Sequence, residues 1–114
     1  MNVKQLRDES ERLRLDAQTK RKQADRFTFN ANDYDKADDP VKAGIERMEA
    51  AKLIEEAVTA EQKADELDQD AATQEARALE IDKRQADLQA EHDRQMKALE
   101  SEKARLRGGV GLFS

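Results

Sequence analysis

Residues 39–107 read DPVKAGIERMEAAKLIEEAVTAEQKADELDQDAATQEARALEIDKRQADLQAEHDRQMKALESEKARLR. Pro40 is the only proline of the chain, and no glycine lies between Gly44 and Gly108. Small or apolar residues recur every three to four positions, which is the period of an α-helix. The pattern predicts one very long helix over residues 40–107, on the order of 100 Å in length. Because such a helix is marginal alone in water, we expect other helices to cover its apolar stripe.

Two shorter segments precede this helix. Residues 28–39 are rich in Asn and Asp, whose side chains favour turns, and predict a polar hinge that also contains aromatic residues. At its end, Asp39 is a suitable N-cap and Pro40 a suitable first helical residue. Residues 1–27 predict a short N-terminal helix, because eight of them, mostly small or apolar, follow one another at alternating spacings of three and four residues. They are Val3, Leu6, Ser10, Leu13, Ala17, Lys20, Ala24 and Phe27.

A heptad count places Ala57 at position a and Ala60 at position d of the long helix. The apolar residues at these positions predict an oligomer seam formed by Ala57, Ala64, Leu67, Ala71, Ala78, Ile81, Leu88, Leu99 and Leu106. Upstream of residue 60 the stripe is broader, which is typical of a segment where several helices meet. It predicts a broad helical core formed by Val41, Ile45, Met48, Ile54 and Val58.

The charges beside the seam favour parallel pairing of identical helices. In that arrangement Lys63 faces Asp68 and Arg77 faces Asp82 of a second chain, whereas one acidic pair repels. Each exposed pair contributes only tenths of a kcal/mol, so the charges bias the orientation without fixing it. A secondary stripe at position b indicates either additional partner helices or a surface that binds the N-terminal helix.

The ends and the hinge carry the residues that we expect to contact other proteins. Gly108 follows the helical pattern directly and predicts its end, so that residues 108–114 form a Gly-rich apolar tail. The tail either docks into a partner or is a frayed end. The hinge aromatics either fix the hinge or form a hot spot for another protein. The docking candidates are Phe27, Phe29, Tyr34, Val110, Leu112 and Phe113.

Composition supports an extended helical chain. Charged residues make up 41% of the sequence and aromatic residues 4%, which is typical of coiled coils and, without heptads, of disorder. The net charge of −5, with both signs interleaved, disfavours direct nucleic-acid binding. The chain has no cysteine, no signal-peptide core and no apolar stretch of the roughly 18 residues that a membrane span needs. We therefore expect a cytoplasmic protein without a membrane span.

Catalytic, metal and cofactor sites are not expected. The acidic segment 30–39 lacks the glycine and the closing glutamate of a calcium loop. His92, the only histidine, lies on the seam, where it either titrates against its symmetry mates or acts as a polar residue that sets the register. No set of residues resembles a nucleophile with its base, so we expect no enzymatic activity.

The remaining function class is protein assembly. The segment 74–80, QEARALE, and the ending GGVGLFS resemble small virion or assembly proteins of tailed bacteriophages. The resemblance is one of composition over the whole chain, and it implies a multicopy capsid-internal, ejection, scaffolding or tail-associated component within a virion. We expect other protein chains as partners, as a homo-oligomer and in a larger assembly. The alternative is a soluble helical adaptor or chaperone that binds one protein client.

Overall fold

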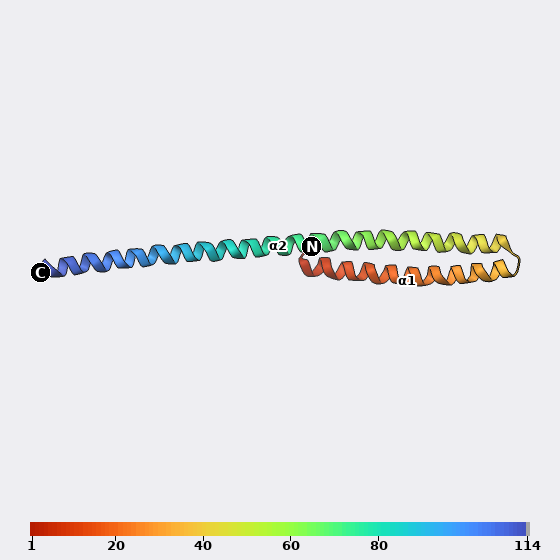
Figure 1. Cartoon of the computed structure of the whole chain (residues 1–114), viewed down its shortest axis with the longest axis horizontal. Coiled ribbons are helices and arrows are strands. Elements are labelled where there is room, and N and C mark those ends of the chain that lie inside the picture. Colours follow the sequence, from red (N-terminus) through yellow and green to blue (C-terminus); the bar gives the residue numbers. More distant parts are fainter. Residues whose placement is uncertain (114) are drawn as a thin grey trace. The chain divides into compact units, whose positions relative to one another are not determined.

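The computed structural model has an all-α fold, which confirms the predicted class (Figure 1). Helix α1 spans Val3–Lys36 and helix α2 spans Pro40–Phe113. The structure describes the backbone of residues 1–113 and the side chains of residues 1–108. Contacts divide the chain into two units, residues 1–75 and residues 76–114.

The first unit is an antiparallel helical hairpin. Helix α1 runs back along the first part of α2, and the two helices are joined by a short turn (Figure 1, red to orange beside yellow to green). The N-terminus of α1 is closed by a capping box: Asn2 Oδ1 accepts a hydrogen bond from the Gln5 backbone N–H at 2.8 Å, and Gln5 Oε1 accepts one from the Asn2 N–H at 2.9 Å. These contacts satisfy two amide donors that the first turn leaves free.

The turn between the helices occupies residues 37–39. Asp38 has a positive φ of 59°, and its N–H donates to the Asp35 carbonyl at 3.1 Å. The Asp39 N–H donates to the Tyr34 carbonyl at 2.9 Å, which completes a Schellman motif. Asp39 then caps α2, because its Oδ1 accepts from the Lys42 N–H at 3.2 Å. The predicted N-cap at Asp39, with Pro40 in the first position of the helix, is therefore confirmed.

The predicted hinge over residues 28–39 is wrong for most of its length. Residues 28–36 belong to α1, and only residues 37–39 leave the helix. The prediction weighed the turn preference of Asn and Asp too heavily. Ala31 and Tyr34 continue the same three-and-four spacing as the preceding seam residues, and Ala31 is fully buried. Packing against α2 therefore overrides the local preference.

Alanines at seven-residue intervals line the interior of the hairpin. Helix α2 buries an alanine at position a of five successive heptads, and α1 buries small residues at the same spacing. The buried residues are Ser10, Ala17, Ala24 and Ala31 in α1 and Ala43, Ala50, Ala57, Ala64 and Ala71 in α2. Small side chains allow two helix backbones to approach closely. Leu6 and Leu67 are the large residues that close the seam at its open end, where both contact Ala71.

The broad core predicted upstream of residue 60 is not formed within the single chain. Ala43 and Ala50 fill the interior positions there, and the larger residues lie on other sides of α2. Val41 and Met48 are 71% and 74% exposed. The prediction followed side-chain size, whereas the continued heptad register decides which face is covered. The exposed residues of the predicted core are Val41, Ile45, Met48, Ile54 and Val58.

Residues 76–113 form the last part of α2, and every described side chain from Ala76 to Gly108 is exposed. The predicted end of the helix at Gly108 is also wrong, because the α2 backbone stays helical to Phe113. Glycine lowers helix propensity by about 1 kcal/mol but does not forbid helical dihedral angles. The described glycines have no positive φ.

Enlarging a seam alanine tests the close approach of the helices. Replacing Ala57 by Leu is expected to destabilise the hairpin by about 1–3 kcal/mol, because Ala57 is fully buried against Ala17. Urea unfolding followed by far-ultraviolet circular dichroism measures the change. Ala51→Leu, at an exposed position of the same helix, is the matched control and should change stability by less than about 0.5 kcal/mol. Equal stability of the two variants would contradict the alanine seam.

Candidate protein-interaction surfaces

The first four residues of the predicted oligomer seam lie inside the hairpin. Ala57, Ala64, Leu67 and Ala71 are buried. Ala57 contacts Ala17 of α1, and Leu67 contacts Leu6. Helix α1 of the same chain therefore covers this part of the seam, where the sequence prediction expected a second chain.

A row of ion pairs runs along one edge of the hairpin at intervals of seven residues, with one interval of fourteen residues before the pair nearest the turn. Three arginines of α1 bind carboxylates of α2, and the pair nearest the turn has the opposite polarity. The pairs are Arg7 with Glu75 at 2.9 Å, Arg14 with Asp68 at 2.7 Å, Arg21 with Glu61 at 2.7 Å, and Arg47 with Asp35. Arg14 also reaches Asp65 at 2.7 Å.

These ion pairs change the interpretation of the charges beside the seam. The sequence prediction paired Asp68 with Lys63 of a parallel second chain, whereas Asp68 binds Arg14 in its own chain. On the other edge, Lys20 Nζ lies 3.4 Å from Glu56 and 3.3 Å from Asp16. The charged residues between positions 56 and 75 therefore form ion pairs between α1 and α2 of one chain.

The ion pairs shift the pKa values of two carboxyl groups. The hydrogen bond from Arg14 is the largest influence that lowers the pKa of Asp68, and a hydrogen bond from Ser10 lowers it further. The hydrogen bond from Arg47 lowers the pKa of Asp35 in the same way. Both carboxylates remain in contact with solvent, so each pair contributes modestly to stability.

Acid is expected to weaken the hairpin. A carboxyl group whose pKa is lowered by folding stabilises the fold above its unfolded pKa of about 4, and this stabilisation is lost as the pH falls through the folded pKa. The thermal midpoint of the full chain should therefore fall between about pH 6 and about pH 2. Arg14→Gln should reduce this fall relative to Arg26→Gln, which removes the same charge outside the row of ion pairs. An identical pH dependence in both variants would contradict a role for Arg14.

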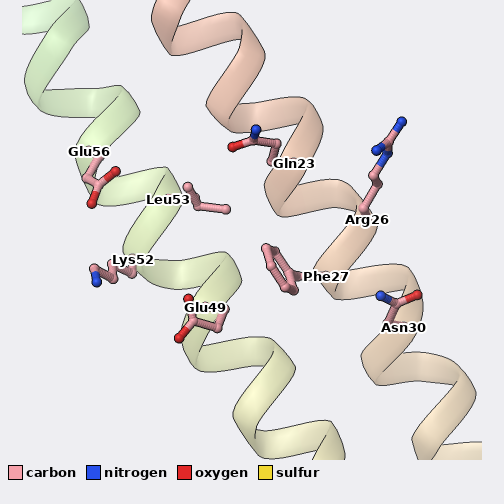
Figure 2. Close-up of a pocket in the computed structure, with 8 residues that line it drawn as sticks. All are labelled: Gln23, Arg26, Phe27, Asn30, Glu49, Lys52, Leu53 and Glu56. Atoms are coloured by element: carbon pink, nitrogen blue, oxygen red, sulfur yellow. The ribbon is translucent and has the colours of Figure 1, made fainter.

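The aromatic docking candidates differ in their surroundings. Phe27 is half-buried and points between the helices towards Leu53 (Figure 2). Tyr34 is also half-buried, and Lys42 Nζ lies 5.7 Å from the centre of its ring. Phe29 is 66% exposed. Phe27 and Tyr34 thus pack within the hairpin, whereas Phe29 remains accessible to another molecule.

An open groove of about 510 Å³ lies beside Phe27 on one edge of the hairpin (Figure 2). Phe27 and Leu53 form its apolar floor, and six polar or charged residues surround them: Gln23, Arg26, Asn30, Glu49, Lys52 and Glu56. The groove contains carboxylate, amide and cationic groups but no histidine or cysteine. Because the groove is open, it fits a side chain of a partner protein better than an enclosed small molecule.

Phenylalanine substitutions separate packing from docking. Phe27→Ala is expected to lower the unfolding free energy by about 1–2 kcal/mol, because half of a large side chain leaves the helix interface. Phe29→Ala should leave the unfolding free energy within about 0.5 kcal/mol of the parent, because its side chain is exposed. Urea unfolding of both variants makes the comparison. A larger loss for Phe29→Ala would reverse these assignments.

The second part of the predicted seam has no contact partner among the described residues. Leu88 is 70% exposed, and the other four residues are exposed as well: Ala78, Ile81, Leu99 and Leu106. His92 is also exposed in this segment. Isolated apolar residues on a surface are ordinary, whereas several of them along one face of a helix make that face a candidate interaction surface.

Three further features of the sequence analysis concern the C-terminal tail, metal sites and membrane spans. Val110, Leu112 and Phe113 lie outside the residues whose side chains are described. Within the described residues, no group of three His, Cys, Asp or Glu side chains is placed to hold a metal ion. No helix in that part of the chain is both long and apolar enough to cross a membrane.

Sequence reasoning missed the seam alanines upstream of residue 57 and the contribution of Ala31 and Tyr34. The sequence does contain this signal, because alanine recurs every seven residues both in α1 and in the first part of α2. The repeat continues upstream of Ala57 in α2 and downstream of Phe27 in α1, where the prediction did not follow it. The row of ion pairs was harder to find, since it requires the helices to be antiparallel and in one register.

No protein-family model, curated protein or solved structure matches this chain.

Proposed function

We propose that this chain is a non-enzymatic structural or assembly protein that associates through residues 78–106 of α2. The observation that supports the proposal is the uncovered apolar row of this segment, whose residues continue the heptad register of the hairpin. The hairpin needs no second chain at its own seam, because α1 already fills it. Association is thus assigned to the part of α2 that α1 does not cover.

The energetics favour association over an isolated helix. A single helix in water gains little stability from its own hydrogen bonds. Complete burial of a Leu or Ile side chain contributes about 1.5–3 kcal/mol. Two copies of the segment would bury Ile81, Leu88, Leu99 and Leu106 from each chain, all of which are now exposed. This contribution is large enough to offset a substantial part of the entropy lost on association.

Other exposed groups are candidates for fastening the oligomer into a larger structure. Phe29 and an outward apolar patch of α2 formed by Val41, Ile45 and Met48 are accessible. The apolar tail at residues 108–114 is a further candidate, predicted from its sequence. The compositional resemblance to virion and assembly proteins of tailed bacteriophages favours a multicopy particle component as the setting.

The hairpin itself favours a second candidate function, a helical adaptor or chaperone for one protein client. A hairpin whose interior is closed within one chain can exist as a single copy, and its outward patch or the groove beside Phe27 would then bind the client. The two candidates predict different masses. An adaptor stays a monomer of 13.0 kDa in the absence of its client, whereas an assembly protein forms an oligomer of fixed size.

Charge substitutions on the uncovered row test the proposal. The triple variant Ile81→Asp, Leu88→Asp and Leu99→Asp is expected to shift the full chain from oligomer to monomer, because each carboxylate would have to be desolvated at the interface. Sedimentation equilibrium measures the mass across a dilution series.

Leu79→Asp is the matched control, because Leu79 is equally exposed but lies outside positions a and d. It should leave the mass of the oligomer unchanged. A parent chain that is monomeric at all micromolar concentrations, or an oligomer that survives the triple substitution, would contradict association through this row.

A further inference from the structure

The uncovered seam has a symmetric order of residues. Its positions a and d from residue 81 to residue 106 are Ile81, Gln85, Leu88, His92, Gln95, Leu99, Glu102 and Leu106. The order of apolar and polar residues is the same when it is read from either end, and its midpoint lies between residues 93 and 94. Two identical antiparallel helices centred there would therefore place apolar residues against apolar residues and polar residues against polar residues in every layer.

We infer that residues 78–106 bind a second copy of this chain in antiparallel orientation, with Leu88 facing the partner's Leu99 and Ile81 facing the partner's Leu106. The inference rests on the proposed function and names the partner and its orientation. A two-fold arrangement of this kind is closed, because each copy presents the same surface to the other. The four apolar side chains that it covers are all exposed in the single chain.

The polar layers distinguish the antiparallel from the parallel arrangement. In the antiparallel register Gln85 faces the partner's Glu102, and the amide N–H groups can donate to the carboxylate. His92 faces the partner's Gln95, which can also form a hydrogen bond with it. In the parallel arrangement Glu102 would face the same residue of the partner, and two carboxylates would be brought together in the seam. Only the antiparallel register gives each polar seam residue a complementary neighbour.

The charges beside the seam are compatible with this register. One edge carries Asp82, Gln89, Met96 and Lys103. It therefore holds one acidic and one basic residue, so no two like charges meet on this edge. The other edge brings Arg84 near the partner's Arg105. Arg84 already forms a salt bridge with Glu80 of its own helix at 2.8 Å, which reduces the repulsion.

The length of the inferred contact fits the part of the seam that α1 leaves open. The hairpin covers the seam as far as Gln74, whose side-chain amide donates to the Met1 carbonyl at 3.2 Å. In the inferred register, residues whose numbers sum to 187 face each other, so the partner's Gly108 faces Leu79. The apolar seam residues of the inferred contact, from Ile81 to Leu106, therefore lie beyond the residues that α1 covers.

Cysteine cross-linking tests the orientation, because the chain contains no cysteine. The variants Gln85→Cys and Glu102→Cys are prepared separately in the full chain and oxidised alone and after mixing in equal amounts. In the antiparallel register each variant alone should remain uncross-linked, since two copies of residue 85 lie about 25 Å apart along the helix. The mixture should yield a disulfide-linked heterodimer on a non-reducing gel.

A matched control uses Lys83→Cys mixed with Ala104→Cys, whose numbers also sum to 187 but whose heptad position faces away from the seam. This mixture should not cross-link. Efficient cross-linking of Gln85→Cys alone would overturn the antiparallel register and leave self-association intact. A dimeric mass without cross-linking in the first mixture would also overturn the register, whereas a monomeric mass of the parent chain would overturn the proposed function itself.

Discussion

The close approach of α1 and α2 at a seam of alanines is the constraint on which the hairpin depends. Alanine at every seventh position brings the two backbones together but buries little apolar area per residue. Leu6 and Leu67 are the only large residues that the hairpin buries almost completely. The stability of the hairpin is therefore the sum of many small contributions, in which the interhelical ion pairs and the capping interactions at both ends of α1 take part.

The sequence predicted the class of fold and much of the helical register. The three-and-four spacing of residues 3–27 and the a positions from Ala57 to Ala71 are the positions that the structure buries or half-buries. Of the boundary predictions based on single-residue preferences, the start of α2 after Asp39 was confirmed and two others were wrong: Asn and Asp did not end α1 before Lys36, and Gly108 did not end α2. Local preferences of up to about 1 kcal/mol are weaker than a packed face, which explains the first error.

The sequence alone could not show which helix covers the heptad seam of α2. The same heptad pattern is compatible with a second chain and with a segment of its own chain. Only the structure assigns Ala57, Ala64, Leu67 and Ala71 to contact with α1, and only the antiparallel arrangement explains why Arg14 binds Asp68. Residues 78–106 carry a similar pattern without such a covering segment among the described residues, so for them self-association remains a proposal.

A seam of identical residues at identical intervals has a further consequence for the hairpin. Sliding α1 along α2 by one heptad would again place alanine against alanine, so the seam alone does not exclude slipped pairings. The slip is opposed by the three-residue turn, with Asp38 in the left-handed region, and by the reversed polarity of the Asp35–Arg47 pair beside it. Residues 37–39 thus fix the register of α1 against α2. An insertion in this turn would make several alignments of the two helices nearly equal in energy.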